Sequence, residues 1–412
     1  MSVLAINGGT PVRSRPFPAW PVWGDEEIKN LTEVVKSAKW GSLHGDKTAA
    51  LERQFADLHC AREGVCINSG TTALQIALMA ADVEAGAEVI VPAYTFIATA
   101  TAVIEVGCVP IFVDVEAETC NINPVEIEKA ITEKTAAIMP VHFAGRPANM
   151  DEILAIGRKH DLVIIEDAAQ AWGAKWDSLP VGAIGKAGVF SFQSSKNINS
   201  GEGGILLTND SIVAKMARSH ANCGRSDDGE WYEHFYYGGN YRLTEFQAAV
   251  LLAQLQRYPE LHKIRLANLE YLNEKLADIP GIEICRPDDR ISDHACHIFV
   301  FRIIPAEFGS KSKNSIIHAL QKEGIPANGG YSLPLYKQPV FLNKSFGRRG
   351  KSVDFPIDYS AFHCPVTESL CNDQAIWLRQ NMLLGTREDM DDIVNAIRKV
   401  KEQAHTLNEK IS

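Results

Sequence analysis

Apolar and polar positions follow two alternating patterns between residues 65 and 208. Short apolar runs rich in Val, Ile and Ala predict buried strands, and the longer stretches between them repeat apolar residues at helical spacing. The predicted strands are 65–68, 88–91, 110–113, 136–141, 163–166, 189–192 and 204–208, and the predicted helices are 71–81, a segment ending at 106, 124–131 and 151–160. This alternation is typical of an α/β fold in which a mostly parallel, seven-stranded sheet lies between helices.

The chain on either side of this block has a different pattern. Residues 1–23 are rich in Pro, Gly and aromatic residues, and they predict an extended arm because proline disfavours helix at the preceding residue. Further helices are predicted at 25–38, 48–58, 242–256, 261–279, 313–323 and 390–403, and further strands at 282–285 and 297–304. We therefore predict an arm (1–23), a large α/β domain (24–262) and a smaller C-terminal α+β domain (263–412).

Composition and charge narrow the classes of function. Of the 412 residues, 46% are hydrophobic and 22% are charged, as in ordinary globular proteins. The net charge of −10 disfavours a general nucleic-acid or anionic-membrane binder. The nine cysteines are scattered without a C-x-x-C pair, and no apolar run reaches membrane-spanning length. We expect a cytoplasmic protein with reduced thiols, no metal site and no membrane segment.

Lys196 is the first candidate for chemistry. It lies between the apolar run 189–192 and the glycine-rich turn 201–204. Desolvation in such surroundings lowers the pKa of a lysine and makes the neutral amine available for a Schiff base. A lysine in an exposed surface loop is the alternative, and this stretch alone does not decide between the two.

A second candidate site follows the predicted strand 65–68. Ser69, Gly70 and Thr71 stand at the start of an apolar helix. Their hydroxyl groups and the free N–H groups of a first helical turn suit a phosphate group. An ordinary N-cap by Ser69 or Thr71 explains the hydroxyls equally well.

Two further strand ends carry residues suited to a planar ligand. Asp167 stands at the exit of strand 163–166, where open α/β sheets bind ligands, and its carboxylate suits a cationic ring nitrogen. The alternative is a helix-capping aspartate. Phe96 follows strand 88–91 and suits stacking on a flat ring, the alternative being a core aromatic residue.

These features together match what binding of pyridoxal phosphate requires: an anchored phosphate, a stacked ring, a balanced pyridinium charge and a lysine for the aldehyde. The sequence resembles fold-type I pyridoxal-phosphate enzymes of the DegT/DnrJ/EryC1/StrS aminotransferase family, which makes amino sugars and aminocyclitols. The segments that carry the resemblance are 68–74 (NSGTTAL), 92–99 (PAYTFIAT), 140–145 (PVHFAG), 166–170 (EDAAQ), 191–196 (SFQSSK) with 201–204 (GEGG), and 239–243 (GNYRL).

The resemblance implies a role for each matching residue. Lys196 would hold the cofactor and move protons, and Asp167 would pair with the pyridine nitrogen. The other implied cofactor contacts are Ser69, Gly70, Thr71 and Ser191 at the phosphate, Phe96 on the ring, Gln170 at the ring's hydroxyl oxygen, and Asn240 from a neighbouring subunit. A homodimer with shared active sites follows from the last contact.

The resemblance also implies a reaction. The amino group of glutamate or glutamine would pass through the pyridoxamine form of the cofactor to a keto sugar or a scyllo-inosose-like ketocyclitol, in amino-sugar, aminocyclitol or antibiotic biosynthesis. A looser likeness to 3-amino-5-hydroxybenzoate synthases leaves an aromatising lyase as one alternative, and a non-enzymatic regulatory protein is another.

Several residues keep two interpretations at this stage. Trp172 stands where many family members have histidine, which leaves the shape of the pocket open. Trp20, Tyr331, Tyr336 and Trp377 are candidates to line an acceptor pocket, although packing is the favoured interpretation for each. A structural role is likewise favoured for His142, His220 and His363.

Overall fold

The central sheet has the elements that the sequence pattern predicts. The computed structural model describes residues 3–226, 228–352 and 355–407. The strands lie in the order β1 (Glu63–Ile67), β9 (Gly204–Thr208), β8 (Ala187–Ser191), β5 (Val163–Asp167), β4 (Thr135–Ile138), β2 (Glu88–Pro92) and β3 (Val109–Val113). All neighbouring pairs are parallel except those of β9, which is antiparallel to β1 and β8. The predicted α/β fold with a mostly parallel, seven-stranded sheet is confirmed.

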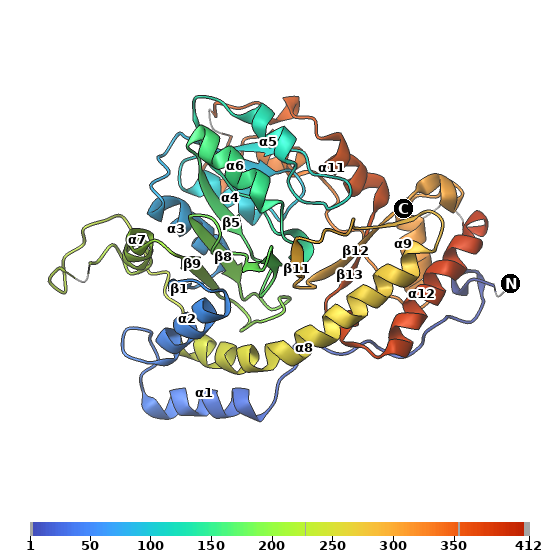
Figure 1. The fold of residues 1–412 in the computed structure, drawn as a ribbon, viewed down its shortest axis with the longest axis horizontal. Coiled ribbons are helices and arrows are strands. Elements are labelled where there is room, and N and C mark those ends of the chain that lie inside the picture. Colours follow the sequence, from blue (N-terminus) through green and yellow to red (C-terminus); the bar gives the residue numbers. More distant parts are fainter. Residues whose placement is uncertain (1–2, 227, 353–354, 408–412) are drawn as a thin grey trace.

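Helices cover both faces of this sheet, because successive strand residues point to opposite sides (Figure 1). Val89 and Val91 of β2 point to one face and Ile90 to the other. The helices on the first face are α3 (Gly70–Ala80), α4 (Ala98–Glu105) and α7 (Ser211–Ala221). Those on the second are α2 (Lys47–Leu58), α5 (Pro124–Ala130), α6 (Met150–His160) and the first half of α8 (Glu245–Ala277). The carboxyl ends of the parallel strands therefore meet at one edge, where ligands bind in such folds.

The C-terminal region has the predicted α+β character. An antiparallel sheet of β10 (Ile282–Ile284), β12 (Ile298–Ile303) and β13 (Ala375–Arg379) packs against α9 (Lys313–Lys322) and α12 (Arg387–Glu402). The predicted strands did not include β13, a short segment that is stabilised by pairing with β12. The remaining elements are α1 (Asp25–Ser37), β6 (Lys175–Trp176), β7 (Leu179–Pro180), β11 (Ile291–Asp293), α10 (Pro339–Leu342) and α11 (Pro365–Ser369).

The long helix α8 corrects one prediction. It is continuous, whereas the sequence pattern predicted two helices at 242–256 and 261–279. Pro259 lies inside α8 and removes a backbone hydrogen bond, but burial on both sides outweighs this local cost. The first half packs on α1 and α2, and the second on β10 and α12, so the predicted domain boundary at 262/263 falls inside a shared helix. No described helix, α8 with its 33 residues included, is apolar enough over the length that a membrane crossing needs.

The N-terminal arm lies along the small domain and then reaches the large one. Leu4 is fully buried in the hydrophobic core of the small domain. The guanidinium of Arg13 pairs with Asp389 of α12 at 2.6 Å, and both side chains are largely buried. Further along the arm, the indole N–H of Trp20 donates to the carbonyl oxygen of Ser194 at 3.1 Å. The arm therefore bridges the two domains beside the turn that follows β8 and carries Ser194 and Lys196.

Candidate active site

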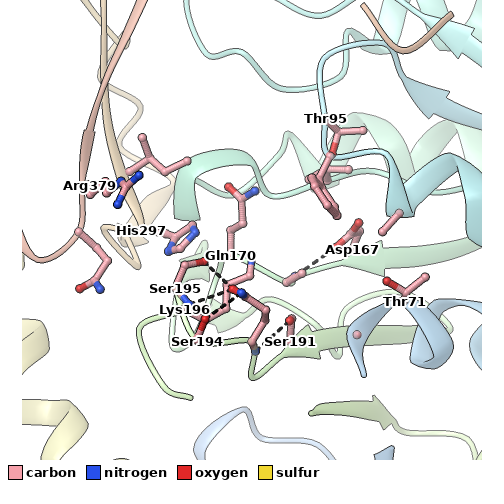
Figure 2. A pocket seen from close by; sticks show the side chains of 18 of the residues that line it. Thr71, Thr95, Asp167, Gln170, Ser191, Ser194, Ser195, Lys196, His297 and Arg379 are labelled. Carbon is pink, nitrogen blue, oxygen red and sulfur yellow. Dashed lines mark hydrogen bonds between the residues drawn. The ribbon is translucent and has the colours of Figure 1, made fainter. Parts of the chain in front are cut away.

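One cavity opens where the large domain, the small domain and the arm meet. Its volume is about 950 Å³, and it is lined by the carboxyl ends of β1, β2, β5 and β8, the start of β12 and the end of β13. Figure 2 shows Asp167 and Thr71 on one side, Arg379 and His297 on the other, and Lys196 between them. The predicted site residues that line this cavity are Ser69, Gly70, Thr71, Phe96, Asp167, Gln170, Ser191 and Lys196. Asn240 is exposed and lies outside it.

The start of α3 forms one end of the cavity. Ser69 is the N-cap, since its Oγ accepts the backbone N–H of Thr72 at 3.1 Å, so the capping interpretation is confirmed for this residue. The first N–H groups of the helix still lack intrahelical partners and suit an anion. Gly70 is required by a close approach, because a Cβ there would lie 2.8 Å from the Cβ of Ser191. The absence of a side chain lets the hydroxyl of Ser191 stand next to this helix start.

Asp167 lies at the middle of the cavity, at the end of β5. It is 5% exposed, and its carboxylate accepts the hydroxyl of Thr99 at 2.8 Å and the N–H of Ala169 at 3.1 Å. Burial raises the pKa of Asp167, and these two donors and the positive charge of Lys196 oppose that shift. The neighbouring Glu166 points to the opposite face of the sheet, where it accepts the N–H groups of 182, 184 and 185. Asp167 is therefore the carboxylate that faces the cavity.

Lys196 reaches the cavity from a turn that follows β8. The backbone N–H of Lys196 closes this turn by donating to the carbonyl oxygen of Gln193 at 2.9 Å. Burial lowers the pKa of Lys196 to about 8, while Asp167 acts in the opposite direction. At pH 7 about a tenth of the amine is therefore neutral, far more than for an ordinary lysine, and the predicted lowering of the pKa is confirmed. The side chain of Lys196 is half-buried in the cavity, so the alternative of a lysine in an exposed surface loop is wrong.

The opposite wall consists of residues that no sequence motif indicated: His297, Asn328, Arg379, Gln380 and Asn381. They were missed because β12, β13 and the loops beside them reach the large domain only in the folded chain. Trp20, Tyr331 and Trp377 also line the cavity, and Tyr331 and Trp377 pack against a hydrophobic cluster in its wall as well. Tyr336 instead lies in the core, where its hydroxyl donates to Glu368 at 2.6 Å.

Comparison with known proteins places this chain in a family. The DegT/DnrJ/EryC1/StrS aminotransferase family matches the chain over residues 21–398. The protein belongs to this family. The chain is 35% identical to an L-glutamine:2-deoxy-scyllo-inosose aminotransferase of Streptoalloteichus tenebrarius, over 96% of this chain and 97% of the relative. It is 34% identical to the 3-amino-5-hydroxybenzoate synthase of Amycolatopsis mediterranei, over 91% and 94% of the two chains.

Solved structures agree with this assignment. The crystal structure of a 3-amino-5-hydroxybenzoic acid synthase superposes with a TM-score of 0.86 at 32% identity and covers 95% of this chain and all of the other. Pyridoxal phosphate is the cofactor of the family, and the protein is a pyridoxal-phosphate-dependent aminotransferase.

The cavity of this aminotransferase fits that cofactor. An anion site at the start of α3, the buried carboxylate of Asp167 and the amine of Lys196 share one cavity. They match the phosphate, the ring nitrogen and the aldehyde of pyridoxal phosphate. Phe96 remains 59% exposed at the rim, which leaves its ring accessible. The amide oxygen of Gln170 accepts the N–H of Ala144 at 2.7 Å, and its side chain also interacts with the hydroxyl of Tyr331, which lines the same cavity.

Trp172 stands behind the cavity and does not line it. Its side chain is fully buried, with the Nζ of Lys196 5.9 Å from its ring and the ring of His297 5.6 Å away. Burial and the charge of Lys196 hold the pKa of His297 well below its usual range. Trp172 therefore influences the pocket indirectly, through its contacts with the two cavity residues Lys196 and His297.

The three histidines for which a structural role was favoured differ in their surroundings. His142 is fully buried between Glu166 and the N–H of Ala148, at 3.0 Å from each, which agrees with a structural role. His220 Nδ1 lies 2.7 Å from the carbonyl oxygen of Tyr237, and His363 is exposed beside Glu368. None of the three lines the cavity.

Proposed function

We propose that this aminotransferase transfers the amino group of glutamine to a ketocyclitol of the scyllo-inosose type, in the biosynthesis of an aminocyclitol. The observation that carries the proposal is the position of Lys196 between a cofactor end and a wall that presents three amide side chains and the guanidinium of Arg379. The amides suit a ring that bears hydroxyl groups and no charge, and the guanidinium suits the carboxylate of the amino donor. The 35% identity to an L-glutamine:2-deoxy-scyllo-inosose aminotransferase over nearly the whole of both chains supports the same substrates.

The residues that line the cavity support a set of cofactor contacts. The start of α3 with Thr71, together with Ser191, is proposed to hold the phosphate, and Phe96 to stack on the ring. Asp167 would keep the ring nitrogen protonated, since its buried carboxylate would pair with the positive charge. When bound, pyridoxal phosphate supplies an aldehyde that takes up the amino group and a ring that accepts an electron pair.

Lys196 is proposed to be both the attachment point and the base. With the cofactor bound, its Nζ would remove the proton from the α-carbon of glutamine and would then deliver that proton to the cofactor. A lysine with the pKa of about 8 is suited to this exchange near neutral pH. Arg379, which lines the opposite wall without an ion pair to any described residue, is proposed to bind the donor's α-carboxylate.

We also propose a homodimer in which Asn240 completes the site of the partner. Asn240 is exposed, and the segment before it carries exposed aromatic side chains, among them Trp231, Tyr232 and Tyr237. Figure 1 shows the chain after α7 extending away from the sheet. Exposed aromatic clusters of this kind are typical of interfaces. Mixing Lys196→Ala and Asn240→Ala subunits tests this, because shared sites restore activity in the hybrid and separate sites do not.

The cytoplasm is the proposed location. All nine cysteines are free thiols. Stable disulfides are common in oxidising compartments and rare in the cytoplasm, so an unpaired set of this size supports a reducing environment.

The two half-reactions test the proposed function separately. Glutamine and glutamate are each added to the pyridoxal form, and the loss of its absorbance is followed. The pyridoxamine form is then mixed with ketocyclitols and, for comparison, with nucleotide-linked keto sugars. We expect reoxidation with a ketocyclitol and preference for glutamine. Preference for a nucleotide sugar contradicts the acceptor, an aromatic product identifies a synthase of the aminohydroxybenzoate type, and absence of both half-reactions indicates a non-enzymatic role.

A further inference from the structure

Gln380, in the wall opposite the phosphate end, is held by a buried arginine. Gln380 directly follows β13, is 3% exposed and lines the cavity. Arg265 of α8 is fully buried behind it. The Nε and Nη2 groups of Arg265 both donate to the Oε1 of Gln380, at 3.0 Å and 2.7 Å. Two charged donors on one oxygen leave the carboxamide of Gln380 with a single orientation.

That orientation decides what Gln380 presents to a ligand. A guanidinium group only donates hydrogen bonds, so the oxygen of the amide must face Arg265 and the NH₂ group must face away. Nε2 of Gln380 has no hydrogen-bond partner among the described residues, although the side chain lies at the cavity surface. Gln380 therefore offers two N–H donors and no acceptor.

The two neighbouring amides of this wall differ in this respect. The Nδ2 of Asn381 donates to the carbonyl oxygen of Pro18 at 2.7 Å, and the Nδ2 of Asn328 to that of Trp377 at 3.4 Å. Their NH₂ groups are thus used by the protein backbone. Of the three amides, Gln380 alone keeps its NH₂ group without a partner in the described part of the chain.

Arg265 is an unusual residue for a purely structural position. It has no carboxylate partner among the described residues, and its Nη1 is buried without a hydrogen bond. Burial lowers the pKa of Arg265 to about 10, and the indole ring of Trp20 lies 5.0 Å from its guanidinium carbon. A buried charge of this kind is costly, and a carboxylate at position 380 would compensate it better than an amide does. The amide is explained if its NH₂ group is needed in the cavity.

We propose that Gln380 is a specificity-determining residue that donates from Nε2 to a ring hydroxyl oxygen of the ketocyclitol, and that Arg265 is the residue that positions it. The inference rests on the proposed function. The donor's α-carboxylate is assigned to the charged Arg379, which leaves the uncharged amide for an uncharged oxygen of the acceptor. Without Arg265, the carboxamide rotates freely and presents its oxygen as often as its NH₂ group.

The test uses the holoenzyme and singly deoxygenated ketocyclitols. The parent enzyme should show a KM about 3- to 10-fold higher for the one analogue that lacks the hydroxyl group facing Gln380. Gln380→Leu should raise the KM for the full ketocyclitol by a similar factor. The variant should then have the same KM for that analogue as for the full ketocyclitol. The half-reaction with glutamine should remain unchanged, which makes it an internal control.

A double-mutant comparison isolates the role of Arg265. Arg265→Met should reproduce part of the defect of Gln380→Leu, and it should add nothing to the KM in the Gln380→Leu background, since Arg265 acts through Gln380. Arg265→Lys should keep part of the selectivity that Arg265→Met loses, because the ammonium nitrogen can still donate to the Oε1 of Gln380. Because Gln380→Leu leaves a buried charge unpaired and risks misfolding, the double variant, which removes both partners, serves as the folded substitute.

Each remaining outcome refutes a defined part of the proposal. If Gln380→Leu, or the double variant, ranks the analogues as the parent does, Gln380 does not select the acceptor. If the defect lies in the glutamine half-reaction, Gln380 contacts the donor instead. If Arg265→Met still changes KM in the Gln380→Leu background, Arg265 does not act through Gln380. A parent that accepts no ketocyclitol refutes the proposed function together with this inference, whereas acceptance without discrimination among the analogues refutes only this inference.

Discussion

Gly204, the first residue of β9, offers a quantitative test of how the phosphate end is built. A Cβ at this position would lie 2.6 Å from the carbonyl carbon and oxygen of Ser69 and 2.7 Å from the backbone nitrogen of Gly70. All three atoms belong to the backbone, so no side-chain rotation relieves the contact. Ordinary contact begins at 3.4 Å, so Gly204→Ala must separate β9 from the turn before α3 by about 0.8 Å, the difference between 3.4 and 2.6 Å.

The free-energy cost of this displacement can be estimated. Added volume in a close-packed region costs about 1–3 kcal/mol. If the turn moves, the phosphate loses its alignment with the first N–H groups of α3. A loss of the same size in binding would raise the Kd for pyridoxal phosphate about 5- to 150-fold. We expect both effects, a lower free energy of unfolding for the cofactor-free protein and weaker cofactor binding.

The assay is a titration of cofactor-free protein with pyridoxal phosphate, paired with denaturant unfolding. Gly41→Ala is the matched control, because a Cβ there meets nothing within 4 Å and its backbone is not left-handed. The control should bind the cofactor and unfold like the parent. If Gly204→Ala also binds and unfolds like the parent, the close approach of β9 to the turn does not shape this site, and the reasoning is wrong.

Three further predictions concern the charged residues of the cavity. Lys196→Ala should abolish the cofactor adduct that borohydride reduction traps in the parent, as seen by mass spectrometry, and slow amino transfer at least about 100-fold. The rate of covalent cofactor attachment to the parent should rise with pH through about 8, because the pKa of Lys196 is lowered and only the neutral amine reacts; a midpoint near 10.5 contradicts this. Asp167→Asn should lower turnover about 100- to 1000-fold. The melting temperature should stay close to that of the parent, since the amide oxygen still accepts from Thr99. An unchanged turnover would contradict the pairing of Asp167 with the ring nitrogen.

Local sequence patterns were sufficient for the residues at the strand ends. Asp167 and the turn at Ser69 each follow a buried strand directly, and the carboxyl ends of parallel strands meet at one edge whatever lies elsewhere in the chain. Lys196 follows β8 within a few residues for the same reason. The order of strands and helices and one side of the candidate site could therefore be predicted from the sequence.

The opposite wall depended on contacts that are distant in sequence. Arg265 and Gln380 are 115 positions apart, and the bond between them requires α8 to continue past Pro259 and β13 to pair with β12. Trp20 reaches the same wall from the arm. Local propensity predicted a break in α8 and no strand at β13, because both are stabilised by burial against partners far along the chain. The sequence by itself determined where the cofactor end lies, and only tertiary packing decided which side chains face it.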